Sequence, residues 1–397
     1  MQLKIGLLND SFPPTIDGVA NTVLNYARSI TKNHGQALVV TPKYPHVTDD
    51  YPFPVFRYHS IPIVGPLGYR AGNPFSPLTI SELHDQGMDL LHVHSPFASS
   101  VLARQLVRGK KHRVPVILTY HTKYEFDIQK FVKAAQLQRV VKRFIRHNIH
   151  LADEVWAVSQ GAGESLRVMG YHGDFKVMPN GTDFARGRAP AAATDELRRI
   201  HNLRPGELIF LSVGRMMWYK NIKITLDALD VVRRAGISFR VIFVGEGADR
   251  PAIEQYTRSL GLEKEAIFTG AIYDRDKVRA YFSLADLFLF PSTYDTSGLV
   301  VKEAAACGCP SLLVAGSCAA EGVTDNQTGL LAEESADSCA KRILAAVRDP
   351  ELLQRIGRGA EEHVYLSWDD AVAMAYKRYE QIIADWPMPL PNLHKPW

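Results

Sequence analysis

Short apolar runs alternate with amphipathic helical patterns along almost the whole chain, and this alternation constrains the fold more than any other feature. The first half contains seven such runs, which read KIGLLN, ALVVTP, PVFRYH, LLHVHS, PVILTYH, EVWAVS and FKVMPN. The second half contains five more, which read LIFLSVG, FRVIFVG, AIFTGA, LFLFPS and PSLLVAG. Runs that are apolar on both faces and separated by helices predict parallel strands covered on both sides. The chain is therefore predicted to be an α/β protein with two parallel sheets in tandem.

The length of the chain indicates two domains. At 397 residues it is too long for one ordinary core and fits two domains of about 150–200 residues each. The stretch 182–197 is rich in Ala, Gly and Pro and has no strand pattern, so it predicts the boundary. We expect one Rossmann-like, doubly wound domain over residues 1–185 and a second over residues 195–367. An amphipathic helix is predicted over residues 368–386.

The composition excludes several classes of protein. The hydrophobic share of 46% and the charged share of 22% are those of a folded soluble protein. No apolar run reaches the roughly 20 residues needed to span a bilayer, and the start MQLKIGLLND lacks the features of a signal peptide. A cytoplasmic protein is expected. The four cysteines match no common zinc or redox pattern and are expected to be buried, reduced thiols.

The charge is distributed unevenly between the two halves. Residues 1–190 carry 22 Lys and Arg against 14 Asp and Glu, whereas the remainder carries 24 against 28. The first half should therefore attract an anionic surface or substrate, and the second half should not do so in general. No nucleic-acid partner is expected.

Residues 291–310 carry the most specific functional signal. A polar turn with Asp295, Ser297 and Gly298 follows the run LFLFPS, and an Ala-rich helix is predicted from about Leu299, with Glu303 one turn in. A strand end, a Gly-containing turn and a helix N-terminus together form an anion site, because free N–H groups and the helix dipole point at the ligand. Carboxylates beside a phosphate would repel it, so we expect them to hold attached hydroxyl groups. This pattern indicates a nucleotide-sugar site.

Two other loops follow predicted strand ends. In VGRMMWYKN, Arg215 and Lys220 are well placed to neutralise a diphosphate, with solvated surface cations as the alternative. In NDSFPPTIDGVANTV, Gly18 opens a helix and allows the loop to approach a ligand closely. That loop lacks the G-x-G-x-x-G fingerprint, which argues against an NAD site.

Three histidines also follow or end predicted strands. His121 comes directly after the run PVILTY and is expected at the carboxyl end of its strand. From position alone, a structural histidine bonded to backbone is the favoured interpretation. The spacing of His92 and His94 would suit a metal pair, but no carboxylate or third histidine is near in sequence, so no metal site is expected.

A basic amphipathic helix is predicted between Asp127 and Asp153, which enclose no acidic residue. Its basic residues are Lys130, Lys133, Arg139, Lys142, Arg143 and Arg146. Its apolar stripe consists of Leu137, Val140, Val141, Phe144 and Ile145. Such a helix can lie on an anionic membrane, or it can pack the stripe against the core and leave the basic face in water. The basic first half of the chain favours membrane contact.

Together these motifs resemble the retaining glycosyltransferases of family 4, which have the GT-B fold. The resemblance covers almost the whole chain, and only the combination of motifs is specific. The motifs are Asp295 and Glu303 with seven residues between them, Gly308-Cys309-Pro310, Gly214-Arg215 with Lys220, Pro179-Asn180-Gly181 with Asp183, and His121-Thr122. The resemblance implies two Rossmann-like domains that face a deep cleft, with the helix over residues 368–386 packed back onto the first.

The resemblance also implies residue roles. The implied donor-binding set is Gly18, Arg215, Lys220, Ile272, Ser297, Gly298, Leu299 and Glu303, and the implied catalytic set is His121, Asp295 and Glu303. Arg215 and Lys220 would hold the diphosphate, and Glu303 would hold the ribose. Asp295, with the backbone at Ser297 and Gly298, would hold the sugar hydroxyls. Gly18 would lie beneath the sugar, main-chain groups near Ile272 would frame the base, and His121 would sit close to the reacting carbon.

The implied reaction is the transfer of a hexose, expected to be glucose, from a UDP-sugar with retention. No carboxylate pair with the separation needed for double displacement is evident. Arg215, Lys220 and the helix N-terminus would stabilise the leaving diphosphate without a metal or another cofactor. Asp295 is one methylene shorter than the usual Glu, which leaves the identity of the sugar less defined.

The acceptor is implied by a narrower resemblance. The stretch YHTKYEFDIQKF and the basic helix after it resemble the bacterial glucosyltransferases that modify diacylglycerol at the cytoplasmic membrane face. A lipid acceptor and a peripheral location on that face are therefore expected. A soluble acceptor such as a sugar phosphate, a nucleotide-sugar epimerase and a binding protein without transferase activity are the alternatives.

Overall fold

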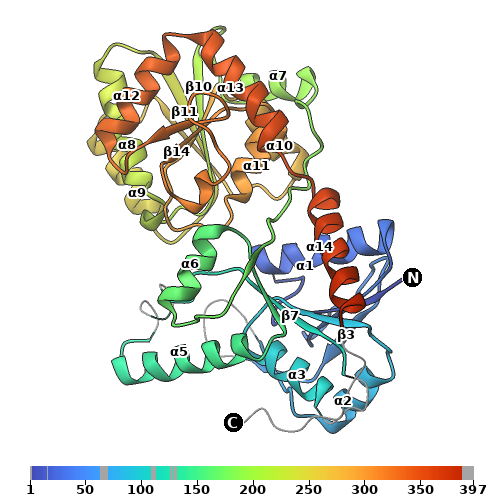
Figure 1. The fold of residues 1–397 in the computed structure, drawn as a ribbon. Helices are drawn as coiled ribbons and strands as arrows, with labels where there is room; N and C mark the ends of the chain where they lie inside the picture. The colour runs from blue at the N-terminus through green and yellow to red at the C-terminus, as the bar shows by residue number, and fades with distance from the viewer. Residues whose placement is uncertain are drawn as a thin grey trace. The chain divides into compact units, whose positions relative to one another are not determined.

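The computed structural model describes residues 2–15, 17–62, 70–108, 113–125, 128 and 132–386. The chain divides into two compact units, Met1–Asn180 with Trp368–Trp397, and Gly181–Ser367 (Figure 1). Each unit has its own parallel sheet with helices on its faces. The prediction of two Rossmann-like halves is confirmed.

The sheet of the first unit contains seven parallel strands in the order β3-β2-β1-β6-β7-β8-β9. Their bounds are β1 Lys4–Leu8, β2 Gln36–Pro42, β3 Val55–Tyr58, β6 Leu90–Val93, β7 Val116–Tyr120, β8 Glu154–Ala157 and β9 Lys176–Val177. Each of the seven predicted runs supplies one of these strands. A separate antiparallel hairpin, β4 (Ser60–Pro62) with β5 (Arg70–Gly72), was not predicted, because three-residue strands are too short to show a periodic pattern.

The helices of the first unit include one from the far end of the chain. Their bounds are α1 Gly18–Asn33, α2 Pro77–His84, α3 Ala98–Val107, α5 Ala135–His150, α6 Gln160–Val168 and α14 Trp368–Ala384. The buried Tyr376 of α14 accepts a hydrogen bond from the Leu3 N–H at 3.1 Å, and Ser29 of α1 donates to Asp369 at 2.7 Å. These contacts attach α14 to the first unit.

The sheet of the second unit contains six parallel strands in the order β12-β11-β10-β13-β14-β15. The strands are β10 Leu208–Val213, β11 Phe239–Val244, β12 Ala266–Gly270, β13 Leu287–Phe290, β14 Ser311–Val314 and β15 Leu330–Ala332. The helices are α7 Ala191–Ile200, η1 Trp218–Lys220, α8 Ile222–Arg234, α9 Arg250–Ser259, α10 Arg275–Leu284, α11 Leu299–Ala306, η2 Cys318–Ala320, α12 Ala336–Val347 and α13 Pro350–His363. All five predicted runs form strands here, and β15 was missed. Helix α7 begins inside the predicted boundary stretch, because three alanines follow Pro190 and favour a helix.

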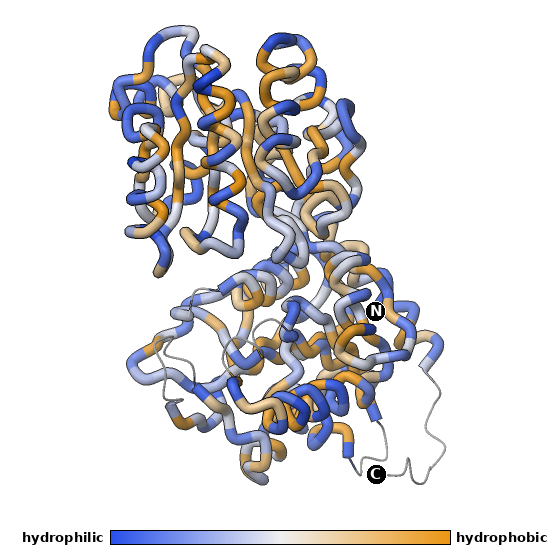
Figure 2. Tube along the Cα trace, turned by 90° about the vertical axis from the view of Figure 1, so that its left-hand side faces the viewer, coloured by the Kyte–Doolittle hydropathy of each residue, from blue (hydrophilic) through white to orange (hydrophobic). Residues whose placement is uncertain are grey.

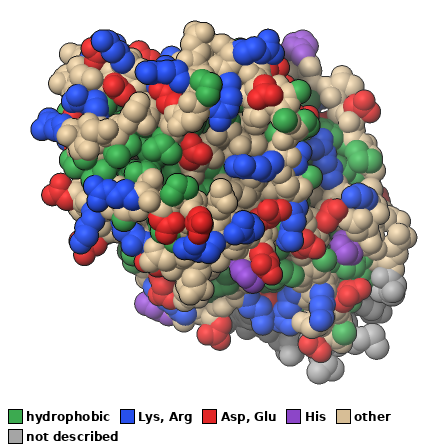
Figure 3. All heavy atoms as spheres, turned by 90° about the horizontal axis from the view of Figure 1, so that it is seen from above, with side chains coloured by type: hydrophobic (Ala, Val, Ile, Leu, Met, Phe, Trp, Pro, Cys, Tyr) green, Lys and Arg blue, Asp and Glu red, His purple; other side chains and the backbone are tan. Residues whose placement is uncertain are grey.

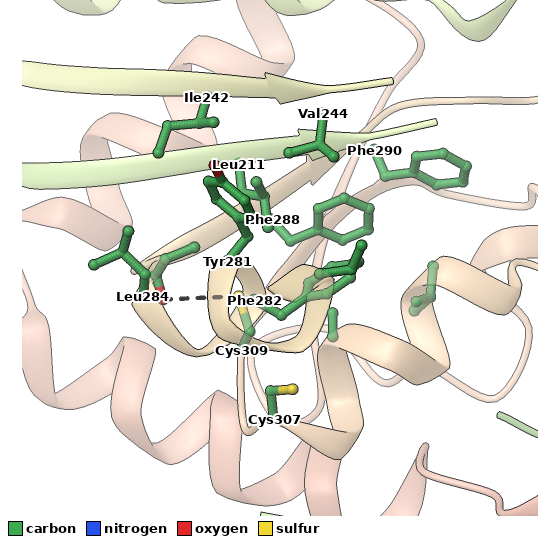
Figure 4. Packing of buried hydrophobic residues seen from close by; sticks show 14 of the residues in the cluster. Leu211, Ile242, Val244, Tyr281, Phe282, Leu284, Phe288, Phe290, Cys307 and Cys309 are labelled. Atoms are coloured by element: carbon green, nitrogen blue, oxygen red, sulfur yellow. Dashed lines mark hydrogen bonds between the residues drawn. The ribbon is translucent and has the colours of Figure 1, made fainter. Parts of the chain in front are cut away.

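The cysteines lie in the core of the second unit. Cys309 packs among Phe282, Phe288 and Leu211, and its thiol lies 3.8 Å from the Ala285 carbonyl oxygen (Figure 4). Burial raises the pKa of the Cys307 thiol to about 11. All four cysteines are free and buried, as predicted.

The surface and the interior separate by polarity in each unit. Figure 2 shows orange, hydrophobic stretches along the strands and alternating colours along the helices. On the face seen in Figure 3, basic and acidic side chains are interspersed, so this face carries no continuous basic track. None of the helices described is long and apolar enough to cross a membrane.

Candidate functional site

The N-terminus of α11 follows the carboxyl end of β13 and is the centre of the candidate site. Gly298 precedes the helix with a φ of 54°, and a Cβ there would lie 2.9 Å from the Cα of Ala319, so only glycine fits. Among the described residues, no side chain caps this N-terminus with a hydrogen bond. The Ser297 hydroxyl is buried and has no hydrogen-bond partner among the described residues. Uncapped amides and an unpaired hydroxyl at a helix N-terminus favour an anionic ligand.

Lys220 and Asp295 form an ion pair beside this helix. The Lys220 Nζ lies 2.5 Å from Asp295 Oδ1, and Ser292 donates to Oδ2 at 2.5 Å. Both carboxylate oxygens are therefore engaged inside the protein. Lys220 also lies within 6 Å of the ring centroids of Phe290 and Tyr294, which fix its position further. The structure brings together two residues predicted for the donor site, and it pairs them with each other.

Arg215 lies on the same edge of the sheet as Lys220. Arg215 is exposed, and within the described chain no side chain forms an ion pair with it. It lines a small pocket together with Gly214, Lys220 and Pro291. The carboxyl ends of β10 and β11 meet here, since the Gly214 N–H donates to the Val244 carbonyl oxygen at 3.0 Å. A cation beside this pocket that forms no ion pair with a described residue is available to bind a phosphate.

Glu303 is held by a residue that the sequence interpretation missed. Arg275, the first residue of α10, places Nη2 at 2.6 Å from Glu303 Oε1 and at 2.5 Å from Asp183 Oδ1. Burial raises the pKa of the Glu303 carboxyl, and the charge of Arg275 opposes that rise. A basic residue at a helix N-terminus is unfavourable for the helix dipole. A basic residue at this unfavourable position in the sequence therefore indicates that Arg275 has a specific acidic partner.

Ile272 follows the carboxyl end of β12, as predicted, and is half-buried against the core. The nearby Asp274 and Asp276 have an Asp-x-Asp spacing that could suggest a metal site. Asp274 instead caps α10, since its side chain accepts from the Asp276 and Lys277 N–H groups at 3.0 and 3.2 Å. Over the described ranges, no group of three or more potential metal ligands occurs.

His121 belongs to a buried cluster of imidazoles in the first unit. Its Nε2 lies 3.0 Å from His94 Nδ1, and the rings are stacked. His92 lies beside His94 and hydrogen-bonds Tyr379 of α14 at 2.6 Å and Thr119 of β7 at 2.7 Å. Burial lowers the pKa of His121 to about 3 and lowers those of His92 and His94 well below the usual value of 6.5. The three rings are therefore neutral near pH 7.

Gly18 is the first residue of α1, as the sequence predicted. The preceding Asp17 caps the helix by accepting from the Val19 and Ala20 N–H groups at 2.8 and 2.7 Å. A Cβ added at Gly18 would meet no atom within 4 Å, and its φ is not in the left-handed region. The fold itself therefore does not require glycine here, and the open space above it is available to a ligand.

Helix α5 exposes much of its apolar stripe. Leu137, Val140 and Phe144 are 53%, 62% and 43% exposed, whereas Ile145 is buried. Val141 and Ile145 pack on the core, as the second interpretation expects, but the rest of the stripe does not. The predicted basic residues within α5 are Arg139, Lys142, Arg143 and Arg146, Lys133 lies just before it, and Lys130 lies outside the described residues. Helix α5 therefore combines basic side chains with exposed apolar ones.

Comparison with protein families assigns both halves of the chain. Residues 16–186 match the model of "Glycosyltransferase Family 4", and residues 193–363 match that of "Glycosyl transferases group 1". The two matched ranges agree with the two units of the structure.

Curated relatives are similar over most of their length. An alpha-monoglucosyldiacylglycerol synthase from Streptococcus pneumoniae is 25% identical over 357 residues, which covers 88% of this chain and 80% of the relative. A GDP-mannose-dependent alpha-mannosyltransferase from Mycobacterium tuberculosis is 27% identical over 356 residues, with 83% of both chains covered. The relatives thus differ in the sugars that their names specify.

Solved structures share the fold. A sucrose-phosphate synthase from Thermosynechococcus elongatus superposes with a TM-score of 0.77 at 24% identity and covers 96% of this chain and 100% of its own. Anabaena HepE in complex with UDP superposes with a TM-score of 0.73 at 20% identity and the same coverage. The GT-B fold predicted from the motifs is confirmed.

The buried histidines predict that the first unit is destabilised by acid. Because their pKa values are lower in the folded chain than the usual 6.5, unfolding takes up protons below that pH, and stability falls as pH decreases. Each such histidine should contribute up to about 1.4 kcal/mol per pH unit. Urea unfolding followed by tryptophan fluorescence measures this slope, and Trp156 reports on the cluster because its ring centroid lies 5.0 Å from that of His92.

The matched variants are His94→Gln and His172→Gln. His94→Gln removes a buried imidazole and should reduce the dependence of the unfolding free energy on pH by the amount due to about one proton. His172→Gln changes an exposed histidine and should leave that dependence unchanged. Equal slopes for both variants would contradict the neutral, buried state of His94.

Proposed function

Both halves of this chain are glycosyltransferase domains, the chain belongs to glycosyltransferase family 4, and on that premise we propose which sugar it transfers and to what. The donor is a UDP-hexose, expected to be UDP-glucose, and the acceptor is a membrane lipid such as diacylglycerol. The transfer retains the anomeric configuration and requires no metal. The names of a glucosyldiacylglycerol synthase relative and a UDP complex of a structural neighbour support this assignment.

The observation that carries the donor proposal is the uncapped N-terminus of α11. It combines unpaired hydrogen-bonding groups with the positive end of a helix dipole, and the cations of Arg215 and Lys220 lie on the same edge of the sheet. A diphosphate would satisfy all of these groups at once. When it departs as UDP, the same groups stabilise the developing negative charge. Metal is not needed for that step.

The Lys220–Asp295 pair suggests how the sugar is held. A diphosphate carries more charge than one carboxylate and would compete for the Lys220 ammonium. Once Lys220 turns to the phosphate, Asp295 Oδ1 loses its partner and becomes free to accept a hydrogen bond from a sugar hydroxyl. The main-chain groups of Ser297 and Gly298 would supply further contacts to the sugar. In this way donor binding exchanges one ion pair for another.

The first unit would supply the acceptor side. A neutral His121 can hydrogen-bond a hydroxyl. A protonated His121 would instead place a positive charge beside the oxocarbenium-like sugar and oppose the formation of that sugar. Gly18 would leave room for the sugar and the diphosphate, because a Cβ added there would meet no described atom within 4 Å. The main chain near Ile272 would contact the base.

The surface of α5 supports a membrane-bound acceptor. Its exposed Leu137, Val140 and Phe144 offer apolar contact with the acyl boundary, and the basic residues offer attraction to anionic lipid head groups. The enzyme would then act as a peripheral protein on the cytoplasmic face, where its lipid substrate is held. A soluble acceptor would need no such surface.

A labelled donor panel tests the assignment. UDP-glucose, UDP-galactose and GDP-mannose are incubated with diacylglycerol in anionic vesicles, with and without a chelator, and the products are resolved by mass spectrometry. We expect a monoglucosyl lipid from UDP-glucose that forms equally well with the chelator present. Loss of product that added magnesium restores would contradict the metal-free transfer, and labelling of only soluble acceptors would contradict the lipid. Consumption of the donor without any acceptor would indicate an epimerase.

Substitution of Lys220 tests the diphosphate site. Lys220→Ala should weaken UDP binding by about 1.5–3 kcal/mol, the range for a hydrogen bond to a charged group. Lys223→Ala is the matched control, because Lys223 lies three residues away, is exposed and pairs with Asp227 on its own helix. Calorimetry with UDP measures both variants. An unchanged affinity in Lys220→Ala would exclude the proposed role.

Charge reversal on α5 tests membrane contact. Arg139→Glu with Arg143→Glu should reduce binding to anionic vesicles, and wild-type binding should fall as salt rises. Arg258→Glu with Lys264→Glu makes the same change in net charge at exposed positions of the second unit and should have little effect. Vesicle sedimentation measures the bound fraction. Equal losses in the two double variants would show that only net charge matters and would remove α5 from the proposal.

A further inference from the structure

Arg275 is fixed more firmly than a surface arginine. Its Nη2 contacts Glu303 and Asp183, its Nε lies 3.0 Å from Asp183 Oδ2, and its guanidinium lies 4.5 Å from the centroid of the Phe184 ring. A guanidinium with two acidic partners and a stacked aromatic ring has little freedom to rotate. It therefore presents one orientation to Glu303.

The contact with Arg275 gives the two oxygens of the Glu303 carboxylate different surroundings. Arg275 binds Oε1, and no described residue hydrogen-bonds Oε2. We propose that Arg275 is a positioning residue for nucleotide binding, which holds one oxygen of Glu303 and leaves the other to accept hydrogen bonds from the ribose hydroxyls. This inference rests on the proposed function for the identity of the ligand. The link between Arg275 and Glu303 does not depend on it.

The charge of Arg275 is as important as its position. Glu303 is 8% exposed, and a buried carboxylate without a counter-ion tends to take up a proton. A protonated carboxyl accepts hydrogen bonds less strongly than a carboxylate. The charged or titratable groups described around Glu303 are Arg275 from α10, Asp183 from the segment before α7, and Cys307 directly after α11. Arg275 is the cation among them.

A purely structural role for Arg275 is the competing explanation. In that case the arginine serves to attach the segment at Asp183 to α10, and the contact with Glu303 is incidental. Asp183 and Arg275 are 40% and 45% exposed, and exposed ion pairs contribute little to stability. The two explanations differ in their dependence on pH, because only the first makes Arg275 control the protonation of Glu303.

The first arm of the experiment measures stability and needs no ligand. In Arg275→Gln, the pKa of Glu303 should rise further, so the folded state holds a proton that the unfolded state releases above its usual pKa of 4.5. The melting temperature of Arg275→Gln relative to Arg275→Gln/Glu303→Gln should therefore fall more steeply, as pH rises from about 5 to about 8, than that of the wild type relative to Glu303→Gln. Equal pH dependence in the two pairs would overturn the proposal.

The second arm measures UDP binding by calorimetry over the same pH range. In Arg275→Gln the affinity should decrease as pH falls, by up to about tenfold for each pH unit below the new pKa, in proportion to the ionised fraction of Glu303. The UDP affinity of the wild type should vary less over this pH range. The phosphate of UDP also titrates near pH 6, but this affects every variant and cancels against the Glu303→Gln background.

Two further variants act as controls. Arg275→Lys keeps the positive charge but loses the forked donor geometry of the guanidinium. It should therefore bind UDP more weakly but with the pH dependence of the wild type. Asp183→Asn removes the other partner of Arg275 and should not make UDP binding sensitive to acid. An acid-sensitive Asp183→Asn variant would favour the structural explanation. If the wild type binds no UDP while the stability arm behaves as expected, the proposed function fails and the coupling of Arg275 to Glu303 remains.

Discussion

The candidate site depends on the N-terminus of one short helix. Helix α11 begins directly after a left-handed Gly298, and no side chain caps it. The parallel sheet places this N-terminus at the same edge as the loops after β10 and β12, because all strands of the sheet run in one direction. A positive helix end, two cations and two carboxylates are thereby gathered from the three connections after β10, β12 and β13, which are distant in sequence. The tight contact between Gly298 and Ala319 of η2 fixes the turn that makes this possible.

The carboxylates of the site are matched to cations inside the protein. Asp295 pairs with Lys220, and Glu303 pairs with Arg275. The two ion pairs differ, however, in what they leave for a ligand to bind. Both oxygens of Asp295 are engaged, so a ligand must displace Lys220 to reach it, whereas Glu303 keeps one oxygen without a hydrogen bond. The first pair can therefore respond to the charge of a diphosphate, while the second can bind hydroxyl groups without rearrangement. Under the proposed function, this division would suit Asp295 to the transferred sugar and Glu303 to the ribose.

The sequence predicted the sheets well because buried parallel strands leave a continuous apolar run. All twelve predicted runs are strands, whereas β15 and the β4–β5 hairpin, each of three-residue strands, left no such pattern. The motif residues after strand ends were also located correctly, since a strand end fixes the sheet edge. The ion-pair partners of these residues could not be predicted from the sequence in the same way. Arg275 and Glu303 are 28 residues apart, and Lys220 and Asp295 are 75 apart, so their pairing depends on how neighbouring elements pack.

The two units differ in the electrostatics of their sheet edges, and this difference bears on the choice of acceptor. The second unit places ion pairs and an exposed arginine at its edge, which suits a charged nucleotide. At the edge of the first unit, His92, His94 and His121 are buried and neutral near pH 7. Neutral imidazoles can donate to or accept from a hydroxyl, but they cannot balance the charge of a phosphate. Under the proposed function, an alcohol such as the free hydroxyl of diacylglycerol would match this edge better than a sugar phosphate, and the basic residues of α5 would be left to contact the lipid surface.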